Sequence, residues 1–182
     1  MRINSYASTG QAIKAPFTFY YVQDNDWNDS HNFQFWNKNF STDTDPGITN
    51  TATAKTIYDP SVSGFALPRT AAFTGFTSSG DNTVNIDEFN VSGSFTKGWN
   101  FYVNGWRTGS TIFFHALGLR NTYSGSSGIG NVAFVSEMIG REWTSGTYSD
   151  SDGRNFGFAS KDMGPQHMSP RSRGYVVRSA LE

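Results

Sequence analysis

Two aspartates of this 182-residue chain have the spacing of calcium ligands. Asp150 and Asp152 precede Gly153, which matches the start of a calcium-binding loop, where carboxylates alternate before a tight turn. Such a loop needs a Glu at its twelfth position, but Lys161 and Asp162 stand there instead. We therefore favour a simple turn, because Asp and Gly are also typical turn residues.

A second calcium-related pattern lies near the N-terminal end of the chain. Trp27, Asn28 and Asp29 form the tripeptide found in the sugar sites of calcium-dependent animal lectins. The Glu-Pro-Asn or Gln-Pro-Asp partner motif of those sites is absent, and the residues around Asp43 and Asp45 are explained equally well as a turn. The sequence therefore does not favour calcium-dependent sugar binding.

Other catalytic and metal-binding constellations lack their minimal parts. The chain has no cysteine, which excludes disulfides, thiolate zinc sites and cysteine nucleophiles. His31, His115 and His167 are too scattered for a spaced ligand set, and the apolar run around His115 favours a core histidine. No nucleophile elbow, phosphate loop or His-Glu-x-x-His motif occurs. The sequence thus predicts a protein that is not an enzyme and needs no cofactor or metal.

Composition narrows the class of protein further. A chain of this length supports one substantial core, so a single domain over residues 1–182 is expected. The net charge of -1 gives no field that would attract nucleic acid. No apolar run approaches about 18 residues, so neither membrane insertion nor a signal peptide is expected.

The elements that must position any site are expected to be short. The 19 Gly and 16 Phe residues, with only 16% charged residues, favour short strands and long loops over helices. Strands are predicted over 16–23, 99–103, 111–116 and 153–159, one short helix from Pro68 to about 77–80, and an ordered loop with inward-facing aromatics over 24–46.

The strand predicted over 153–159 alternates between aromatic residues and small or polar residues. Phe156 and Phe158 are expected to face the core, whereas Asn155 and Gly157 face the other way. The pattern predicts one packed face and one face that is free to vary.

A series of motifs, in order over residues 12–178, carries a family resemblance. They are Lys55-Thr56-Ile57-Tyr58-Asp59-Pro60, Gly64-Phe65-x-Leu67-Pro68, Ala72-Phe73-Thr74-Gly75-Phe76, Phe89-Asn90-Val91-Ser92-Gly93, Gly98-Trp99-Asn100-Phe101-Tyr102, Ile112-Phe113-Phe114, Gly118-x-Arg120, Trp143 and Gly174-Tyr175-x-Val177-Arg178. This succession resembles the variable proteins of diversity-generating retroelements in gut Bacteroidales and their phages, and is similar to the Fibrobacter-type paralogous domain. The resemblance implies an α+β, C-type lectin-like fold with one or two short helices, short antiparallel strands and long ordered loops.

The resemblance also implies which residues bind a ligand. The displayed surface would run from about Phe134 to Arg173, inside a variable segment of about 130–178. Positions that match the family's scaffold are Trp143, Phe156, Phe158, Pro165, Arg171, Gly174, Tyr175, Val177 and Arg178. Positions that match its exchangeable, ligand-binding sites are Phe134, Ser136, Arg141, Glu142, Tyr148, Asn155, Gly157, Lys161, Asp162, Gln166, His167, Met168, Ser169 and Arg173. These side chains are expected to lie on an exposed face.

The sequence departs from the family pattern in several places. His115 replaces a common Pro, Leu117 replaces an Ala, and Ser61-Val62 replaces a frequent Cys-Pro. By the genetic code, adenine-directed mutagenesis of an Asn codon cannot yield Glu, Lys, Gln or Met. A diversified origin is therefore in doubt at four of the candidate positions, Glu142, Lys161, Gln166 and Met168.

The function implied is non-enzymatic ligand recognition, in receptor binding by a phage or in cell-surface adhesion. The implied partner is a host-cell surface protein or glycan, and the implied location is a phage tail or a bacterial surface. Self-association, or attachment to a larger fibre or surface protein, fits the same resemblance. The alternative is a structural fimbrial or phage tail subunit without a dedicated ligand.

Overall fold

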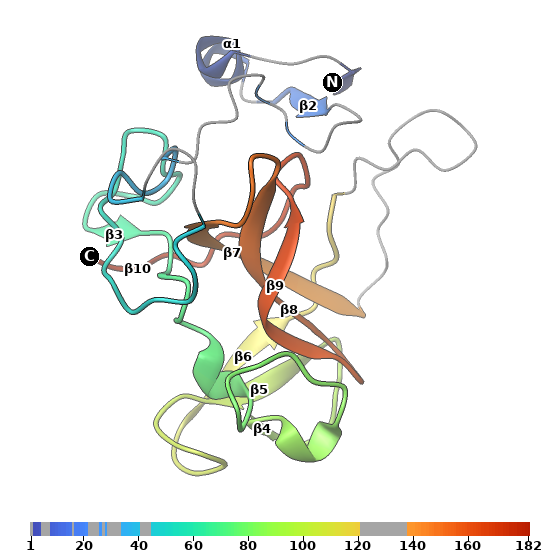
Figure 1. Ribbon diagram of the computed structural model, residues 1–182. Coiled ribbons are helices and arrows are strands. Elements are labelled where there is room, and N and C mark those ends of the chain that lie inside the picture. Colours follow the sequence, from blue (N-terminus) through green and yellow to red (C-terminus); the bar gives the residue numbers. More distant parts are fainter. Residues whose placement is uncertain are drawn as a thin grey trace.

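Strands form nearly all of the regular structure in this chain (Figure 1). The computed structural model describes residues 2–4, 8–15, 17–21, 26, 28, 34–40, 45–120 and 138–182. Within these residues there are three antiparallel sheets and one two-stranded parallel pair. Helical structure is limited to α1 (Thr9–Lys14) and two 3-10 turns, η1 (Thr74–Phe76) and η2 (Ile86–Glu88). The expected α+β class, stated for a C-type lectin-like fold, is therefore wrong, because the structure is mostly β with almost no helix.

The longest strands form one antiparallel sheet of order β7-β8-β9. They are β7 (Ile139–Thr147), β8 (Asp152–Ala159) and β9 (Met163–Pro170). The strand predicted over 153–159 is confirmed by β8, whereas β7 and β9 are not evident from the sequence. Gly140 on β7 is required by packing, since a Cβ there would lie 2.0 Å from Cζ of Phe158. The segment expected to display a variable surface is thus the most regular part of the molecule.

A second antiparallel sheet has the order β4-β5-β6. It consists of β4 (Val91–Ser92), β5 (Gly98–Tyr102) and β6 (Thr111–His115), which confirms the strands predicted over 99–103 and 111–116. The φ of Gly98 is 155°, and a Cβ on it would lie 2.1 Å from the carbonyl oxygen of Phe114. His115 at the end of β6 is exposed, so the expectation of a core histidine is wrong.

Aromatic rings in edge-to-face contact join these two sheets, which lie one above the other in Figure 1. Phe101 and Phe114, from β5 and β6, have ring centroids 5.5 and 5.9 Å from that of Phe156 on β8. Phe158, also on β8, lies 5.6 Å from Phe101. All four side chains are buried, as expected for Phe156 and Phe158. Burial of each ring stabilises the fold by about 2–3 kcal/mol, so this cluster is the main apolar contact between the two sheets.

The predicted helix after Pro68 is also wrong. The chain makes successive turns there and reaches helical geometry only in η1. Tertiary hydrogen bonds explain the difference: Oγ1 of Thr70 accepts from the amide of Thr49 at 2.7 Å and donates to the carbonyl of Gly47 at 2.9 Å. These bonds hold the backbone near Thr70 in an irregular path, while Phe73 still packs into the core as its spacing predicts.

The remaining elements are short. β1 (Arg2–Asn4) pairs in parallel with β2 (Phe19–Tyr21), which lies inside the strand predicted over 16–23. β3 (Phe65–Ala66) pairs with β10 (Ala180–Leu181) close to the C-terminus. The helix α1 begins at a capping box in which Ser8 and Gln11 bond reciprocally, so the start of this helix is specified by the local sequence. None of the helices in the described part of the chain is long and apolar enough to cross a membrane.

Trp143 on β7 is the anchor of the sheet face that points away from the aromatic core. Its buried ring stacks on Tyr175 with centroids 4.5 Å apart and lies 5.7 Å from Trp36. Trp36 belongs to the loop predicted over 24–46, where inward-facing aromatics are expected. Its contact with Trp143 agrees with that expectation. Trp27 and Phe33 of the same loop lie outside the described residues.

We predict that Trp143→Ala lowers the free energy of unfolding by about 3–5 kcal/mol, because the substitution leaves a large cavity and removes a stacked pair. The matched control is Trp106→Ala, since Trp106 is 43% exposed. It is expected to cost about 1 kcal/mol or less. Chemical denaturation measures both, and equal losses for the two variants would contradict the anchoring role of Trp143.

Candidate functional site

Two segments from distant parts of the chain extend the β7-β8-β9 sheet beyond β7. The amide of Trp143 donates to the carbonyl of Val176 at 2.9 Å, and the amide of Val176 donates to the carbonyl of Arg141 at 3.1 Å. Arg120 and Gly174 exchange two backbone hydrogen bonds at 2.8 and 3.0 Å. Residues 174–176 therefore lie beside β7, and residues 118–120 contact both, because Arg120 pairs with Gly174 and the amide of Gly118 donates to the carbonyl of Ile139 at 2.9 Å.

The two faces of this sheet carry different chemistry. Phe156 and Phe158 point from β8 into the aromatic core. Asn155 and Gly157 alternate with them and point to the opposite face, beside Trp143 and Arg141 of β7. His167 of β9 pairs directly with Asn155 and so shares that face. The polar side chains of Arg141, Asn155 and His167 therefore lie together on the face away from the core.

The predicted ligand-binding residues are not all exposed. Glu142, Asn155, Gly157 and Ser169 are buried, so the expectation of an exposed face is wrong for these four. The half-buried ones are Arg141, Asp162, Gln166, His167 and Arg173, and the exposed ones are Tyr148, Lys161 and Met168. Phe134 and Ser136 lie outside the described residues. The side chains of Arg141 from β7 and His167 from β9 lie over Asn155 and Gly157, which explains why alternation in β8 does not produce a free face.

The structure also divides these residues among several places. Met168 pairs with Arg154, whose guanidinium carbon lies 5.3 Å from the ring centroid of Tyr148, so these side chains share the core-side face of the sheet. The side-chain amide of Gln166 donates to the carbonyl of Gly80 at 2.7 Å and holds β9 to a neighbouring loop. Only part of the predicted set therefore forms a single site.

Arg141, Asn155, Gly157, His167, Asp162 and Arg173 make up that part, which we call the donor cluster. Nη1 of Arg141 lies 3.3 Å from Oδ1 of Asn155. Because Gly157 has no side chain, the guanidinium of Arg141 and the imidazole of His167 both lie over it: a Cβ there would be 2.0 Å from Nη1 of Arg141 and 2.7 Å from Cδ2 of His167. A glycine at this position therefore allows the two side chains to approach one another.

Burial lowers the pKa of two basic side chains in the donor cluster. Desolvation lowers the pKa of Arg141 and of His167, and the positive charge of Arg141 lowers the pKa of His167 further. Asp162 opposes both shifts, but its Oδ2 lies 3.7 Å from Nε2 of His167, beyond hydrogen-bond distance. The histidine is therefore neutral near pH 7, and the positive charge of the cluster is held by its arginines.

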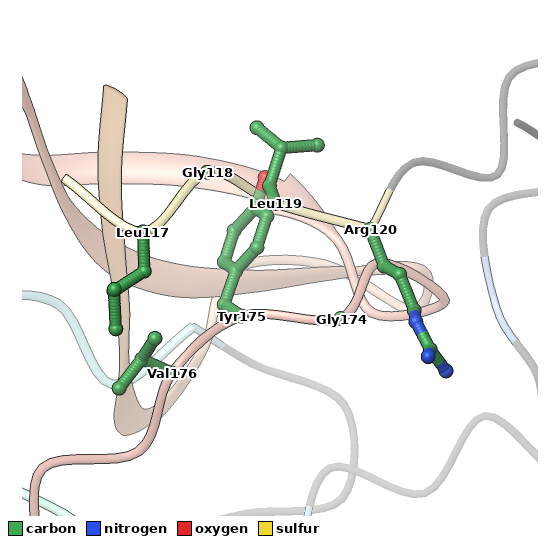
Figure 2. Close-up of a pocket in the computed structure, with 7 residues that line it drawn as sticks. All are labelled: Leu117, Gly118, Leu119, Arg120, Gly174, Tyr175 and Val176. Carbon is green, nitrogen blue, oxygen red and sulfur yellow. The ribbon is translucent and has the colours of Figure 1, made fainter. Parts of the chain in front are cut away.

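A mostly apolar groove of about 450 Å³ lies next to the donor cluster. It is lined by Leu117, Gly118, Leu119, Arg120, Gly174, Tyr175 and Val176. Figure 2 shows the side chains of Leu117 and Val176 directed toward one another at one end, the ring of Tyr175 in the middle and Arg120 at the other end. The hydroxyl of Tyr175 lies 3.3 Å from Nη1 of Arg173, so this tyrosine borders both the groove and the cluster.

Residues 117–120 are missing from the sequence-based prediction of the site. Gly118 and Arg120 are in the resembling motifs, and Tyr175 matches a scaffold position, but no local pattern indicates that they meet. The backbone bonds between Arg120 and Gly174 bring them together across more than fifty residues of chain. Such a long-range pairing leaves no spacing in the sequence by which it can be found.

The side chain of Glu142 lies on the face of β7 that points to the core and is enclosed by other residues of the protein. Its carboxylate is 2% exposed, and Oε1 lies 3.7 Å from Nε of Arg178. The guanidinium of Arg178 in turn lies 3.9 Å from the ring centroid of Phe114. Burial raises the pKa of Glu142 from 4.5 to about 7, although the charge of Arg178 opposes the shift. This residue links the sheet to the C-terminal segment through Arg178.

The aspartates that resemble a calcium loop form the turn between β7 and β8. The amides of Tyr148 and Ser149 donate to the carbonyl of Asp152, and Oγ of Ser149 lies 3.1 Å from its Oδ2. The guanidinium of Arg171 donates to the carbonyl of Asp150 and pairs with Asp26 at 2.6 Å. A protein cation thus already contacts this turn. In the described residues, no group of three or more His, Asp or Glu side chains could hold a metal ion.

Comparison with protein-family models, with curated proteins and with solved structures gives no match to this chain.

Titration of Glu142 should make the protein less stable as pH rises. Because its folded pKa of about 7 exceeds its ordinary 4.5, the neutral carboxyl stabilises the fold below pH 4.5, and this contribution is lost as pH rises to 7. The loss is up to about 3 kcal/mol, since each pKa unit corresponds to about 1.4 kcal/mol. Glu142→Gln should abolish this part of the pH dependence between pH 4.5 and 7.5, as measured by urea denaturation. An unchanged pH profile in the variant would contradict the assignment.

Calcium at about 1 mM should leave the melting temperature unchanged, because the Asp150 turn is occupied by Arg171 and offers too few oxygen ligands. Thermal-shift measurement with calcium and with a chelator tests this. A rise in melting temperature that disappears in Asp150→Ala and Asp152→Ala would instead establish a calcium site.

Proposed function

We propose that this chain is a non-enzymatic recognition protein, of the kind seen in the variable proteins of diversity-generating retroelements. The observation that carries the proposal is the donor cluster, which places half-buried Arg and His side chains and the buried Asn155 beside an apolar groove. Binding hot spots combine arginine and aromatic residues with exclusion of water, and the cluster with Tyr175 has that composition.

Rigid support of these side chains favours recognition over a passive surface. The backbones of Arg141 and Tyr175 are held in an extended sheet, and Trp143 stacks beneath Tyr175. Side chains that are fixed before binding lose little conformational entropy when a partner docks. The proposed partner is a protein or glycan on a host-cell surface, and the proposed location is a phage tail or bacterial surface.

The test is adsorption of the fluorescently labelled protein to a panel of gut Bacteroidales cells, measured by flow cytometry. Arg141→Ala should weaken adsorption by about 2 kcal/mol or more, as expected for a central arginine. Tyr148→Ala, which changes the opposite face of the sheet, should weaken it much less. Arg69→Ala is the matched control, because Arg69 is exposed and its guanidinium donates to the carbonyl of Asn50 at 3.2 Å, away from the donor cluster.

Equal adsorption of all these variants, or none by the wild type, would favour the alternative of a structural fimbrial or tail subunit. The neighbouring genes provide an independent criterion. A reverse transcriptase gene with a near-copy of the codons for residues 130–178 would support the proposal, since such a template is the source of diversity in these systems.

A further inference from the structure

Four nitrogen atoms of the donor cluster lack a hydrogen-bond partner. They are Nε of Arg141, Nδ2 of Asn155, Nε2 of His167 and Nε of Arg173, each inaccessible to solvent and without a partner in the structure. Three of them are donors, and the nitrogen of His167 donates or accepts according to its tautomer. Asn155 is fully buried, so the missing acceptor cannot be replaced by bulk water. A buried donor without an acceptor costs about 1–3 kcal/mol, and several such donors in one place indicate that an oxygen-rich group completes the site.

The charges of the cluster are unbalanced as well. Arg154 of β8 and two arginines that follow β9 each have a carboxylate: Arg154 pairs with Asp45, Arg171 with Asp26 at 2.6 Å, and Arg178 with Glu142 at 3.7 Å.

Arg141 and Arg173 differ from these arginines. In the described part of the chain, neither has a carboxylate within salt-bridge distance, and Asp162 is the one acidic neighbour that affects Arg141. A partly buried guanidinium without a counter-ion favours an anionic ligand, because charge-assisted bonds to a carboxylate are about twice as strong as neutral ones. The site therefore has one positive charge more than its own residues neutralise.

The adjoining groove indicates what else the ligand carries. Leu117, Leu119 and Val176 provide an apolar lining, and Tyr175 connects that lining to Arg173 through its hydroxyl. A sugar would leave most of its hydroxyls without partners on such a lining, whereas an aliphatic side chain would be buried favourably. The groove thus favours a peptide over a glycan as the source of the carboxylate.

We infer that the donor cluster and the groove together bind an acidic segment of a target protein, with a carboxylate against Arg141 and Arg173 and an adjacent aliphatic side chain between Leu117 and Val176. This inference deepens the proposed function, on which it rests, by naming the chemical class of the partner.

The experiment measures binding of labelled hexapeptides to the full chain by fluorescence anisotropy. One peptide has a Glu flanked by leucines, and the other has Gln in place of Glu. The Glu peptide should bind at least tenfold more tightly than the Gln peptide. Arg173→Gln should remove that difference, and Leu117→Ser should weaken both peptides, since Leu117 is exposed at the groove and its replacement should not affect folding. Arg69→Gln is the matched control and should change binding less than twofold.

Arg173→Lys keeps the positive charge and serves as a check on folding, together with the melting temperature of each variant. It should retain most of the preference for Glu. Oligogalacturonate and inorganic sulfate are the other probes. Binding of oligogalacturonate that depends on Arg173, without peptide binding, would overturn the choice of a protein target.

Equal binding of the Glu and Gln peptides, or no binding of any probe, would overturn the inference as a whole. Either result leaves the proposed function standing if the protein still adsorbs to cells and Arg141→Ala weakens that adsorption. Loss of adsorption altogether would instead remove the proposed function, so the two failures are distinguishable.

Discussion

Contact between the rings of β8 and those of β5 and β6 is the interaction on which the rest of the structure depends. Phe156 and Phe158 can reach Phe101 and Phe114 only if every second residue of β8 points to the core. That requirement fixes the register of β8 and sends Asn155 and Gly157 to the other face. The polar site is thus a geometric consequence of the aromatic core, because both are carried by the same strand.

Neighbouring segments then determine how much of that polar face reaches solvent. Trp36 and the Asp26–Arg171 pair cover the part around Trp143, which is accordingly buried and neutralised. The part around Arg141 and Arg173 is only half-buried and keeps an unbalanced charge. A single sheet face therefore has one half that holds the fold together and another half whose polar nitrogens lack hydrogen-bond partners within the structure.

The resemblance to retroelement variable proteins and the geometry of the donor cluster lead us to propose a site in the same part of the chain, but for different reasons. The resemblance assigns a broad set of exchangeable positions between Phe134 and Arg173. The structure reduces that set, because Glu142 forms a buried pair with Arg178 and Gln166 binds a neighbouring loop. It also adds Leu117 and its neighbours, which no motif assigns to a site. Recognition in this molecule is thus proposed for a smaller and more strongly charged area than the family pattern implies.

What the sequence determined by itself is local: the strands around Phe101, Phe114 and Phe156 follow from aromatic and β-branched runs with a period of two, and they are found where predicted. Tertiary structure decided the rest. The fold class and the helix predicted after Pro68 were wrong because hydrogen bonds from distant residues, such as those of Thr70, outweigh weak local propensity. The groove depends on pairing between Arg120 and Gly174, and long-range backbone pairing is set by the packing of the whole chain, since no residue type at either position specifies its partner.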